Sequence, residues 1–129
     1  NSTRYGQNKI LKVKKKFLRK IKAGSLEINR SLSIKAAKKF KDNYFDWIYI
    51  DTDHSYSTTI KELYAYESKI KPNGIIAGHD YVMGNWAKSL KYGVIEAVAE
   101  FCVKKNWKII YLTADFTENN SFAIQRINN

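Results

Sequence analysis

Two short apolar runs, at residues 45–50 and 74–78, each stop abruptly at aspartate and histidine residues. The first run, FDWIYI, is followed by DTDH, and the second run, GIIAG, is followed by HDY. Aromatic and β-branched residues of this kind are typical of buried strands. Apolar residues at helical spacing follow each run, so strands and helices alternate along the chain. This alternation predicts an α/β layered domain with a mainly parallel sheet.

The same patterns predict the order of the other elements. Gly24 ends the first helix, and Ser33 is the predicted N-cap of the second. Residues 71–74 are predicted to form a turn, and residues 82–92 and 115–120 loops. The expected helices cover residues 8–23, 33–40, 57–70 and 94–102, and the expected strands cover residues 26–29, 45–50, 74–78, 107–112 and 121–127.

A chain of 129 residues without internal repeats or a Pro/Gly-rich linker is the size of one ordinary domain. We subdivide it into a basic amphipathic helix at residues 1–25 and an α/β part at residues 26–129. The single cysteine, Cys102, excludes an intramolecular disulfide and lies in an apolar helical pattern, which predicts a buried, unreactive thiol. No apolar run approaches the ~20 residues of a membrane span, and the polar, basic N-terminal segment lacks the apolar core of a signal peptide. We therefore expect a cytoplasmic protein.

The net charge of +11 is concentrated in the first third of the chain. Residues 1–43 hold 14 of the 23 Lys and Arg residues, but only Glu27 and Asp42 among the acidic ones. One interpretation is an electrostatic patch for phosphates, RNA or anionic lipid. The other, which we favour, is the solvated face of an amphipathic helix whose apolar residues recur at helical spacing.

The ends of the two apolar strands carry the residues that are best suited to chemistry. In parallel α/β sheets, ligands bind beyond the carboxyl ends of the strands, and neighbouring strand ends lie ~5 Å apart. Asp51, His79 and Asp80 are therefore candidate ligands for a divalent cation, and His54 is a candidate general base. The alternative is structural: Asp53 or Ser57 caps the following helix, His54 bonds a loop, and Asp80 ties the loop after its strand.

Several motifs together resemble the C-terminal half of class I S-adenosylmethionine-dependent methyltransferases. The combination is most similar to the small-molecule O-methyltransferase branch, which has a KPGG turn where this chain has KPNG. The motifs are IDTDHSY at residues 50–56, KPNG at 71–74, GHDY at 78–81 and GVIEAV at 93–98, and SLSIKAA at 31–37 resembles a helix start of the family.

The resemblance implies methyl transfer from S-adenosylmethionine to a hydroxyl of a small molecule of sugar or natural-product type. By position, it makes His54 the base and Asp51, His79 and Asp80 the ligands of a Mg or Mn ion. His79 stands where the metal-dependent relatives have Glu. Ser33 and Asp51 become candidate cofactor-binding residues.

The fold implied by the resemblance is a Rossmann-like three-layer sandwich with strand order 3-2-1-4-5-7-6. Here the glycine-rich loop and the first two strands have no counterpart in the sequence, so the predicted domain is incomplete and the strand at residues 45–50 becomes an exposed apolar edge. We expect that the chain is a piece of a longer enzyme, that a second copy covers the edge in a homodimer, or that residues 1–43 pack in a new way. By itself we expect the chain to bind the cofactor weakly or not at all and to be inactive.

Two other functions remain open from the sequence. The D-x-D formed by Asp51 and Asp53 is also how many nucleotide-sugar glycosyltransferases hold manganese and a diphosphate. In that case Asp53 is essential and the His79–Asp80 pair is incidental. Alternatively, the domain is non-catalytic and binds RNA or a partner protein through the basic helix, with a salt dependence typical of phosphate contacts.

Overall fold

The computed structural model describes residues 2–114 and 119–127, and the chain divides into two compact units, residues 1–31 and 32–129. The boundary between these two units follows Ser31, and the subdivision at residue 25 stays a prediction. The loop predicted at residues 115–120 lies mostly outside the described residues.

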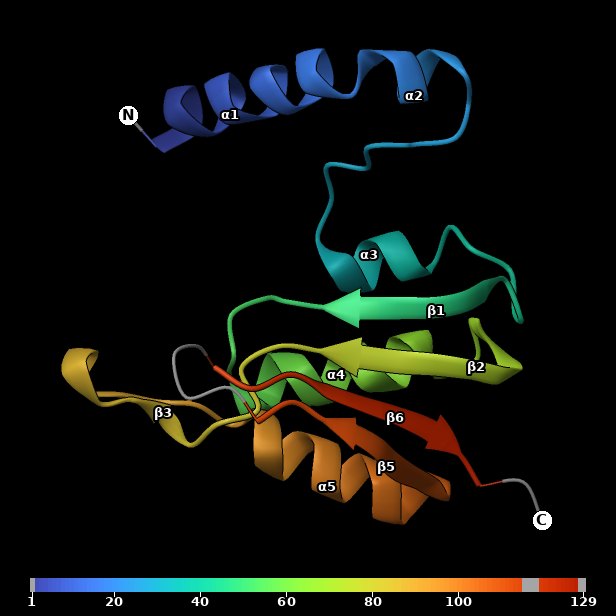
Figure 1. Ribbon diagram of the computed structural model, residues 1–129, viewed down its shortest axis with the longest axis vertical. Helices are drawn as coiled ribbons and strands as arrows, with labels where there is room; N and C mark the ends of the chain where they lie inside the picture. The colour runs from blue at the N-terminus through green and yellow to red at the C-terminus, as the bar shows by residue number, and fades with distance from the viewer. Residues whose placement is uncertain (1, 115–118, 128–129) are drawn as a thin grey trace. The chain divides into compact units, whose positions relative to one another are not determined.

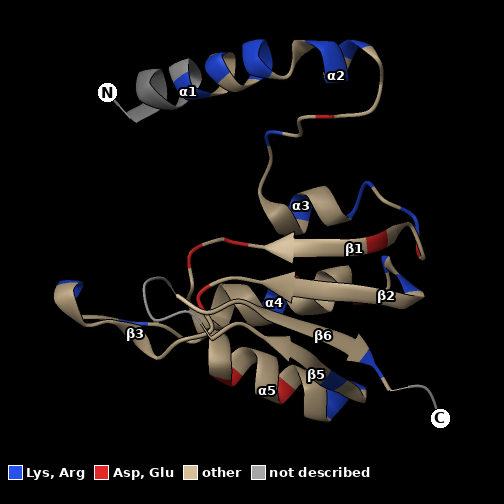
Figure 2. Ribbon diagram, viewed as in Figure 1, with Lys and Arg blue, Asp and Glu red and all other residues tan. Residues whose placement is uncertain are grey.

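The first unit consists of two helices, α1 (Ser2–Lys16) and α2 (Leu18–Lys22), which are separated only at Phe17. Backbone hydrogen bonds continue across this break, since Phe17 N–H donates to Val13 and Ile21 N–H donates to Phe17, each at 3.0 Å. Gly24 follows with a positive φ of 71°, as the predicted helix stop requires. Lys and Arg residues recur along the described part of these helices (Figure 2).

The prediction of a strand at residues 26–29 is wrong. These residues have no regular secondary structure, and a side-chain bond joins Asn29 to Glu27 at 2.7 Å. A strand is stabilised by pairing with a neighbour, and no strand of the described sheet pairs with this segment. An alternating pattern alone is therefore insufficient to predict a strand.

The second unit contains a four-stranded sheet in the order β1-β2-β6-β5 (Figure 1). Strand β1 is parallel to β2, whereas β6 is antiparallel to both of its neighbours, so three of the four strands point the same way. This order matches the last four strands of the order implied by the resemblance, and the Rossmann-like α/β fold is confirmed. The strands are β1 (Phe45–Ile50), β2 (Ile70–Gly78), β5 (Trp107–Leu112) and β6 (Phe122–Arg126).

The sheet carries its core on one face. Helices α4 (Tyr56–Glu67) and α5 (Val94–Lys105) pack against the strands there. The fully or nearly buried cluster comprises Leu63, Ile70, Ile76, Val94, Ala97, Val98, Phe101, Trp107, Phe122 and Ile124. Because residues alternate across a strand, the opposite face carries Trp47, Tyr49 and Tyr111, which are 62%, 48% and 73% exposed. Strand β1 is an edge of the described sheet, as predicted.

Helix α3 (Ser33–Ala37) begins at the residue that was expected to cap it. Leu32 occupies the N-cap position without a side-chain bond, so the prediction that Ser33 caps this helix is wrong. The Ser33 hydroxyl instead donates to Glu62 of α4, and Tyr66 of α4 donates to the Ser33 carbonyl at 2.9 Å. The serine therefore ties α3 to α4.

Two predicted irregular segments contain extra pairing. Residues 71–74, expected as a turn, lie inside β2, where the pairing register with β1 shifts from Phe45–Ile70 to Trp47–Ile75. The segment at 82–92, expected as a loop, forms a small hairpin of β3 (Gly84–Asn85) and β4 (Leu90–Lys91) around the 3-10 helix η1 (Trp86–Lys88). Both features are too short for a period to be visible in the sequence.

Candidate functional site at the ends of β1 and β2

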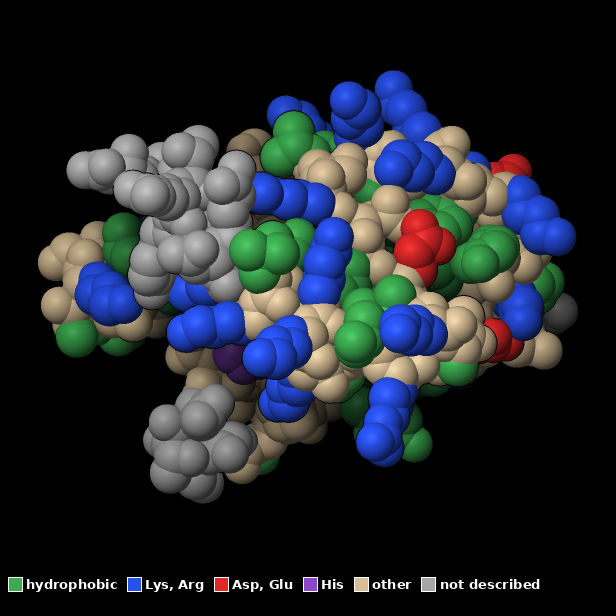
Figure 3. Space-filling model, turned by 90° about the horizontal axis from the view of Figure 1, so that it is seen from above, with side chains coloured by type: hydrophobic (Ala, Val, Ile, Leu, Met, Phe, Trp, Pro, Cys, Tyr) green, Lys and Arg blue, Asp and Glu red, His purple; other side chains and the backbone are tan. Residues whose placement is uncertain are grey.

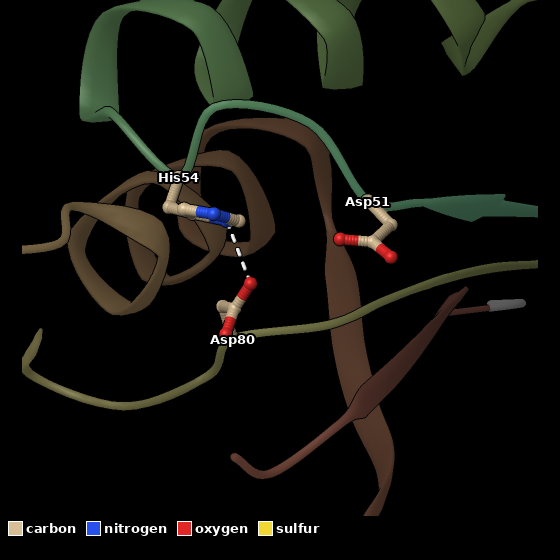
Figure 4. A group of neighbouring side chains, drawn as sticks. All are labelled: Asp51, His54 and Asp80. Carbon is tan, nitrogen blue, oxygen red and sulfur yellow. Dashed lines mark ion pairs between the residues drawn. The ribbon is translucent and has the colours of Figure 1, made fainter. Parts of the chain in front are cut away.

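The ends of the parallel strands β1 and β2 are held side by side. Ile50 pairs with Gly78, and the N–H of His79 donates to the Ile50 carbonyl at 3.0 Å, just beyond the last pair. The loop after β1 and the loop after β2 therefore leave the sheet at the same edge. Asp51, His54 and Asp80 meet there, with one ligand atom from each lying within 4.8 Å of the others (Figure 4).

Both the ring and the backbone of His54 are held by neighbouring residues. Its Nδ1 lies 2.6 Å from Oδ2 of Asp80, and its ring packs against the ring of Tyr92 at a centroid distance of 4.7 Å. Its carbonyl accepts a bond from the N–H of Gly93 at 2.9 Å, and its backbone has a positive φ of 62°. A left-handed backbone is uncommon for a residue other than glycine, so the loop imposes this conformation on His54.

Asp80 is the buried member of the group, with 4% of its surface exposed. Its Oδ2 also lies 3.3 Å from Nδ1 of His79, and its Oδ1 accepts a bond from the side-chain amide of Asn119. A buried carboxylate needs such partners, because an unpaired charge away from water is costly. Asp80 thus links both histidines of the chain.

His79 lies beside this group rather than within it. It contacts Asp80, but the set of mutually close ligand atoms in the described residues is formed by Asp51, His54 and Asp80. Both histidines line one small pocket between the strand ends and α5, together with Ile50, Thr52, Thr59, Val94 and Phe122. The predicted convergence at this edge therefore includes His54, which the spacing alone had placed at its rim.

Asp53 has a structural role at the start of α4. Its Oδ1 accepts bonds from the N–H and hydroxyl of Ser55 at 3.0 and 2.8 Å, and its Oδ2 accepts one from the hydroxyl of Thr58 at 2.8 Å. The bond from the Ser55 N–H is the main cause that lowers the pKa of the Asp53 carboxyl. Ser55 is the N-cap, so the alternative expectation that Asp53 or Ser57 caps this helix is wrong, and Asp53 instead bonds the capping residue.

Glu62 is a buried carboxylate that the sequence analysis missed. Only 1% of its surface is exposed, and it accepts bonds from the hydroxyls of Ser33 and Thr52, the latter at 2.8 Å. Its position beside Leu63, on the face of the helix that packs on the sheet, is the signal that marks it as buried. Because Ser33 donates to Glu62, its hydroxyl is engaged within the fold.

The fold defines a class of protein, the Rossmann-like α/β domains. A family model described as "Methyltransferase domain" matches residues 8–81, which is more than half of the chain. The chain therefore belongs to this methyltransferase-domain family, and the class I S-adenosylmethionine-dependent class predicted from the motifs is confirmed. The small-molecule O-methyltransferase branch stays a prediction.

Solved structures show the same fold at low sequence identity. A candidate rRNA-methylase from Clostridium thermocellum is 19% identical, with a TM-score of 0.58 over 88% of this chain and 67% of its own. A candidate DNA modification methylase from Thermus thermophilus is 8% identical, with a TM-score of 0.57 over 77% of this chain and 52% of its own. An S-adenosylmethionine-dependent methyltransferase from Methanosarcina mazei is 10% identical, with a TM-score of 0.52 over 70% of this chain and 63% of its own.

The chain thus spans about half to two-thirds of the length of these similar structures. No curated protein matches it. Among the described residues, no helix is both long and apolar enough to cross a membrane.

Proposed function

We propose that the chain forms the acceptor side of an enzyme that transfers a methyl group from S-adenosylmethionine to a hydroxyl of a small molecule. Membership of the methyltransferase-domain family supports the reaction class. The observation that carries the proposal is the position of His54, which lies beside Asp51 and Asp80 where β1 and β2 end.

The residues of the site have a simple task in this reaction. S-adenosylmethionine, when bound, supplies a methyl group on a sulfonium that is already electrophilic. His54 would take the proton that the acceptor hydroxyl loses when its oxygen receives the methyl group. The fixed position of His54 also helps to hold the acceptor oxygen in line with the methyl group, which removes much of the entropic barrier.

A divalent cation is part of this proposal. The carboxylates of Asp51 and Asp80 each place an oxygen within 4.8 Å of the other, and such oxygen donors fit Mg or Mn. We assign Asp51 and Asp80 as the residues that would hold the ion, and His79 stays a predicted third ligand. The ion, when bound, would lower the pKa of the acceptor hydroxyl, so an acceptor with two adjacent oxygens, such as a sugar diol or a catechol, fits best.

The cofactor fits only part of the site formed by the described residues. Asp51 lies at the end of β1, whose outer edge has no partner strand in the described sheet. Ser33, the other predicted cofactor residue, donates its hydroxyl to Glu62. We therefore propose that the glycine-rich wall of the cofactor site comes from a segment other than residues 1–129.

Binding and transfer assays test this function. Calorimetry on the 129-residue chain is expected to show no S-adenosylmethionine binding at micromolar concentrations, and micromolar binding would contradict the incomplete site. With the complete gene product, we expect transfer of labelled methyl from S-adenosylmethionine to a diol or catechol acceptor. Binding of a nucleotide sugar with no methyl transfer would support the glycosyltransferase interpretation instead.

The hydrogen bonds of Asp53 argue against that interpretation. Both of its carboxylate oxygens accept bonds at the start of α4, from Ser55 and from Thr58. A D-x-D site needs this carboxylate for a metal ion and a diphosphate. The structural role of Asp53 therefore favours the methyltransferase proposal.

A second candidate function is nucleic-acid binding, favoured by the basic first unit. Eight Lys and Arg residues lie between residues 9 and 22, and Lys and Arg side chains far outweigh acidic ones in the view of Figure 3. The similar structures from C. thermocellum and T. thermophilus are named as candidate nucleic-acid methylases. Anisotropy titrations with a labelled RNA, repeated at rising salt, test it. Strong, salt-sensitive binding that survives His54→Gln would support this candidate.

A further inference from the structure

We propose that Asp80 and Tyr92 are positioning residues for His54, which fix its ring so that Nδ1 carries the proton and Nε2 faces the acceptor hydroxyl. This inference rests on the proposed function, because it names the nitrogen that acts as the base. It adds a second role for Asp80, which the proposed function treats only as a cation ligand. Tyr92 has no role in the sequence analysis.

The first support is the contact between His54 and Asp80. The distance of 2.6 Å between Nδ1 and Oδ2 is within hydrogen-bond reach. Because an ionised carboxylate can only accept, we assign the proton between the two atoms to Nδ1. Asp80 is buried, so water competes little for this oxygen. In a neutral imidazole that donates through one nitrogen, the other nitrogen is the acceptor. The contact therefore leaves Nε2 as the basic atom.

The second support is the clamp formed by the start of α5. The Tyr92 ring packs on the His54 ring at 4.7 Å, with 35° between the ring planes. The next residue, Gly93, donates its N–H to the carbonyl of His54. A side chain at Gly93 would lie 2.4 Å from the backbone nitrogen of Tyr56, so only glycine allows this close approach. Ring and backbone of His54 are thus both held by the same short segment.

The third support is the set of donors around Asp80. His79 lies 3.3 Å from the same oxygen as His54, and Asn119 donates to the other oxygen. These donors fix the carboxylate in the orientation that accepts the His54 proton. His54 Nδ1 then stays outside the ligand set of a cation, because a ligating nitrogen cannot carry a proton.

Two-bond proton–nitrogen correlation spectra of the 129-residue chain at about pH 8 test this inference, because most histidines are neutral there. We expect His54 to be the Nδ1–H tautomer in the wild type. Asp80→Asn and Tyr92→Leu should each produce a mixture of tautomers. Tyr111→Leu should leave His54 unchanged, because Tyr111 is exposed on β5, which β6 separates from β2. An Nε2–H tautomer in the wild type would overturn the inference.

A titration of the same sample with Mg²⁺ tests the competing role of His54 as a cation ligand. We expect the Nδ1–H signal to persist at saturating Mg²⁺. Loss of that proton on Mg²⁺ addition would show that His54 binds the ion, and would overturn the positioning role. If Asp80→Asn does not fold, Tyr92→Leu and this titration still decide the question.

These readouts need neither cofactor nor acceptor, so they separate the inference from the proposed function. If the tautomer is as expected but the complete gene product transfers no methyl group, only the proposed function fails. If methyl transfer occurs, Asp80→Asn should lower kcat about 100-fold while the Kd for S-adenosylmethionine changes less than about threefold. Transfer with an unchanged kcat in Asp80→Asn would refute the positioning role alone.

Discussion

The hydroxyl of Thr52 donates to Oε2 of Glu62 at 2.8 Å, and this bond joins the loop that carries Asp51 and His54 to helix α4. Ser33 of α3 donates to the other oxygen of the same carboxylate. Glu62 is almost fully buried, so these two hydroxyls are its main polar partners in place of water. One side chain therefore fixes three segments around the site.

Replacing Glu62 by Ala is expected to lower the free energy of unfolding by about 2 kcal/mol, because two part-buried hydrogen bonds, from Ser33 and Thr52, are lost. Glu62→Gln keeps one acceptor oxygen and should cost less. Urea unfolding measures both values. The matched control is Glu96→Ala on the exposed side of α5, for which a change below about 0.5 kcal/mol is expected. Equal effects at positions 62 and 96 would contradict the role of Glu62.

Gly93 lets helices α4 and α5 begin close together. An added Cβ would lie 2.4 Å from the nitrogen and 2.5 Å from the Cβ of Tyr56, so one helix start must move. We expect Gly93→Ala to lower the free energy of unfolding by about 1–3 kcal/mol, as overpacking does. Chemical denaturation measures it, with the exposed hairpin variant Lys91→Ala as the control. A neutral Gly93→Ala would show that the helix starts are loosely packed.

Asp53 should make the free energy of unfolding depend on pH in the acid range. The bond from the Ser55 N–H, followed by those from the Ser55 and Thr58 hydroxyls, lowers the pKa of Asp53 below 3.8 in the folded state. A lowered carboxyl pKa contributes stability that is present above pH 3.8 and is lost as the pH falls through the folded value. Urea unfolding should therefore show wild type more stable than Asp53→Asn at about pH 6, with the difference shrinking below pH 3.8. A constant difference across this range would be evidence against the role of these hydrogen bonds in stabilising the ionised Asp53.

Cys102 should react slowly with thiol reagents while the chain is folded. Burial raises the pKa of its thiol from 9.0 to about 11, so the thiolate fraction at neutral pH falls by about 100-fold. Alkylation by iodoacetamide at about pH 7.5 measures the rate, and the same chain in urea is the control. Equal rates in the folded and unfolded chain would contradict the burial of this thiol.

Much of the fold was predictable because it depends on local patterns. The run from Phe45 to Ile50 and the apolar face of α5 carry periods long enough to identify a strand and a helix, and both are confirmed. The segment at residues 26–29 also alternates but is not a strand, because pairing depends on a neighbour that a local pattern cannot reveal. The hairpin at residues 84–91 was missed because each strand has only two residues.

The candidate site was predictable in position but not in its contacts. The motif spacing placed Asp51 and Asp80 at adjacent strand ends, and the parallel pairing of β1 and β2 brings them together. The left-handed backbone of His54, which turns its ring to Asp80, has no signature in the sequence. Glu62 and Tyr92 were missed because their roles depend on partners that are distant along the chain.

Methyl transfer by variants of the complete gene product tests the account most directly. The measurement is the rate of labelled methyl transfer from S-adenosylmethionine to a diol acceptor in the wild type, His54→Gln and Asp53→Asn. We expect His54→Gln to lower kcat by at least about 100-fold with little change in cofactor affinity, because it removes the base. Asp53→Asn should stay within about tenfold of the wild type. An active His54→Gln enzyme, or a dead Asp53→Asn enzyme that still folds, would contradict the account.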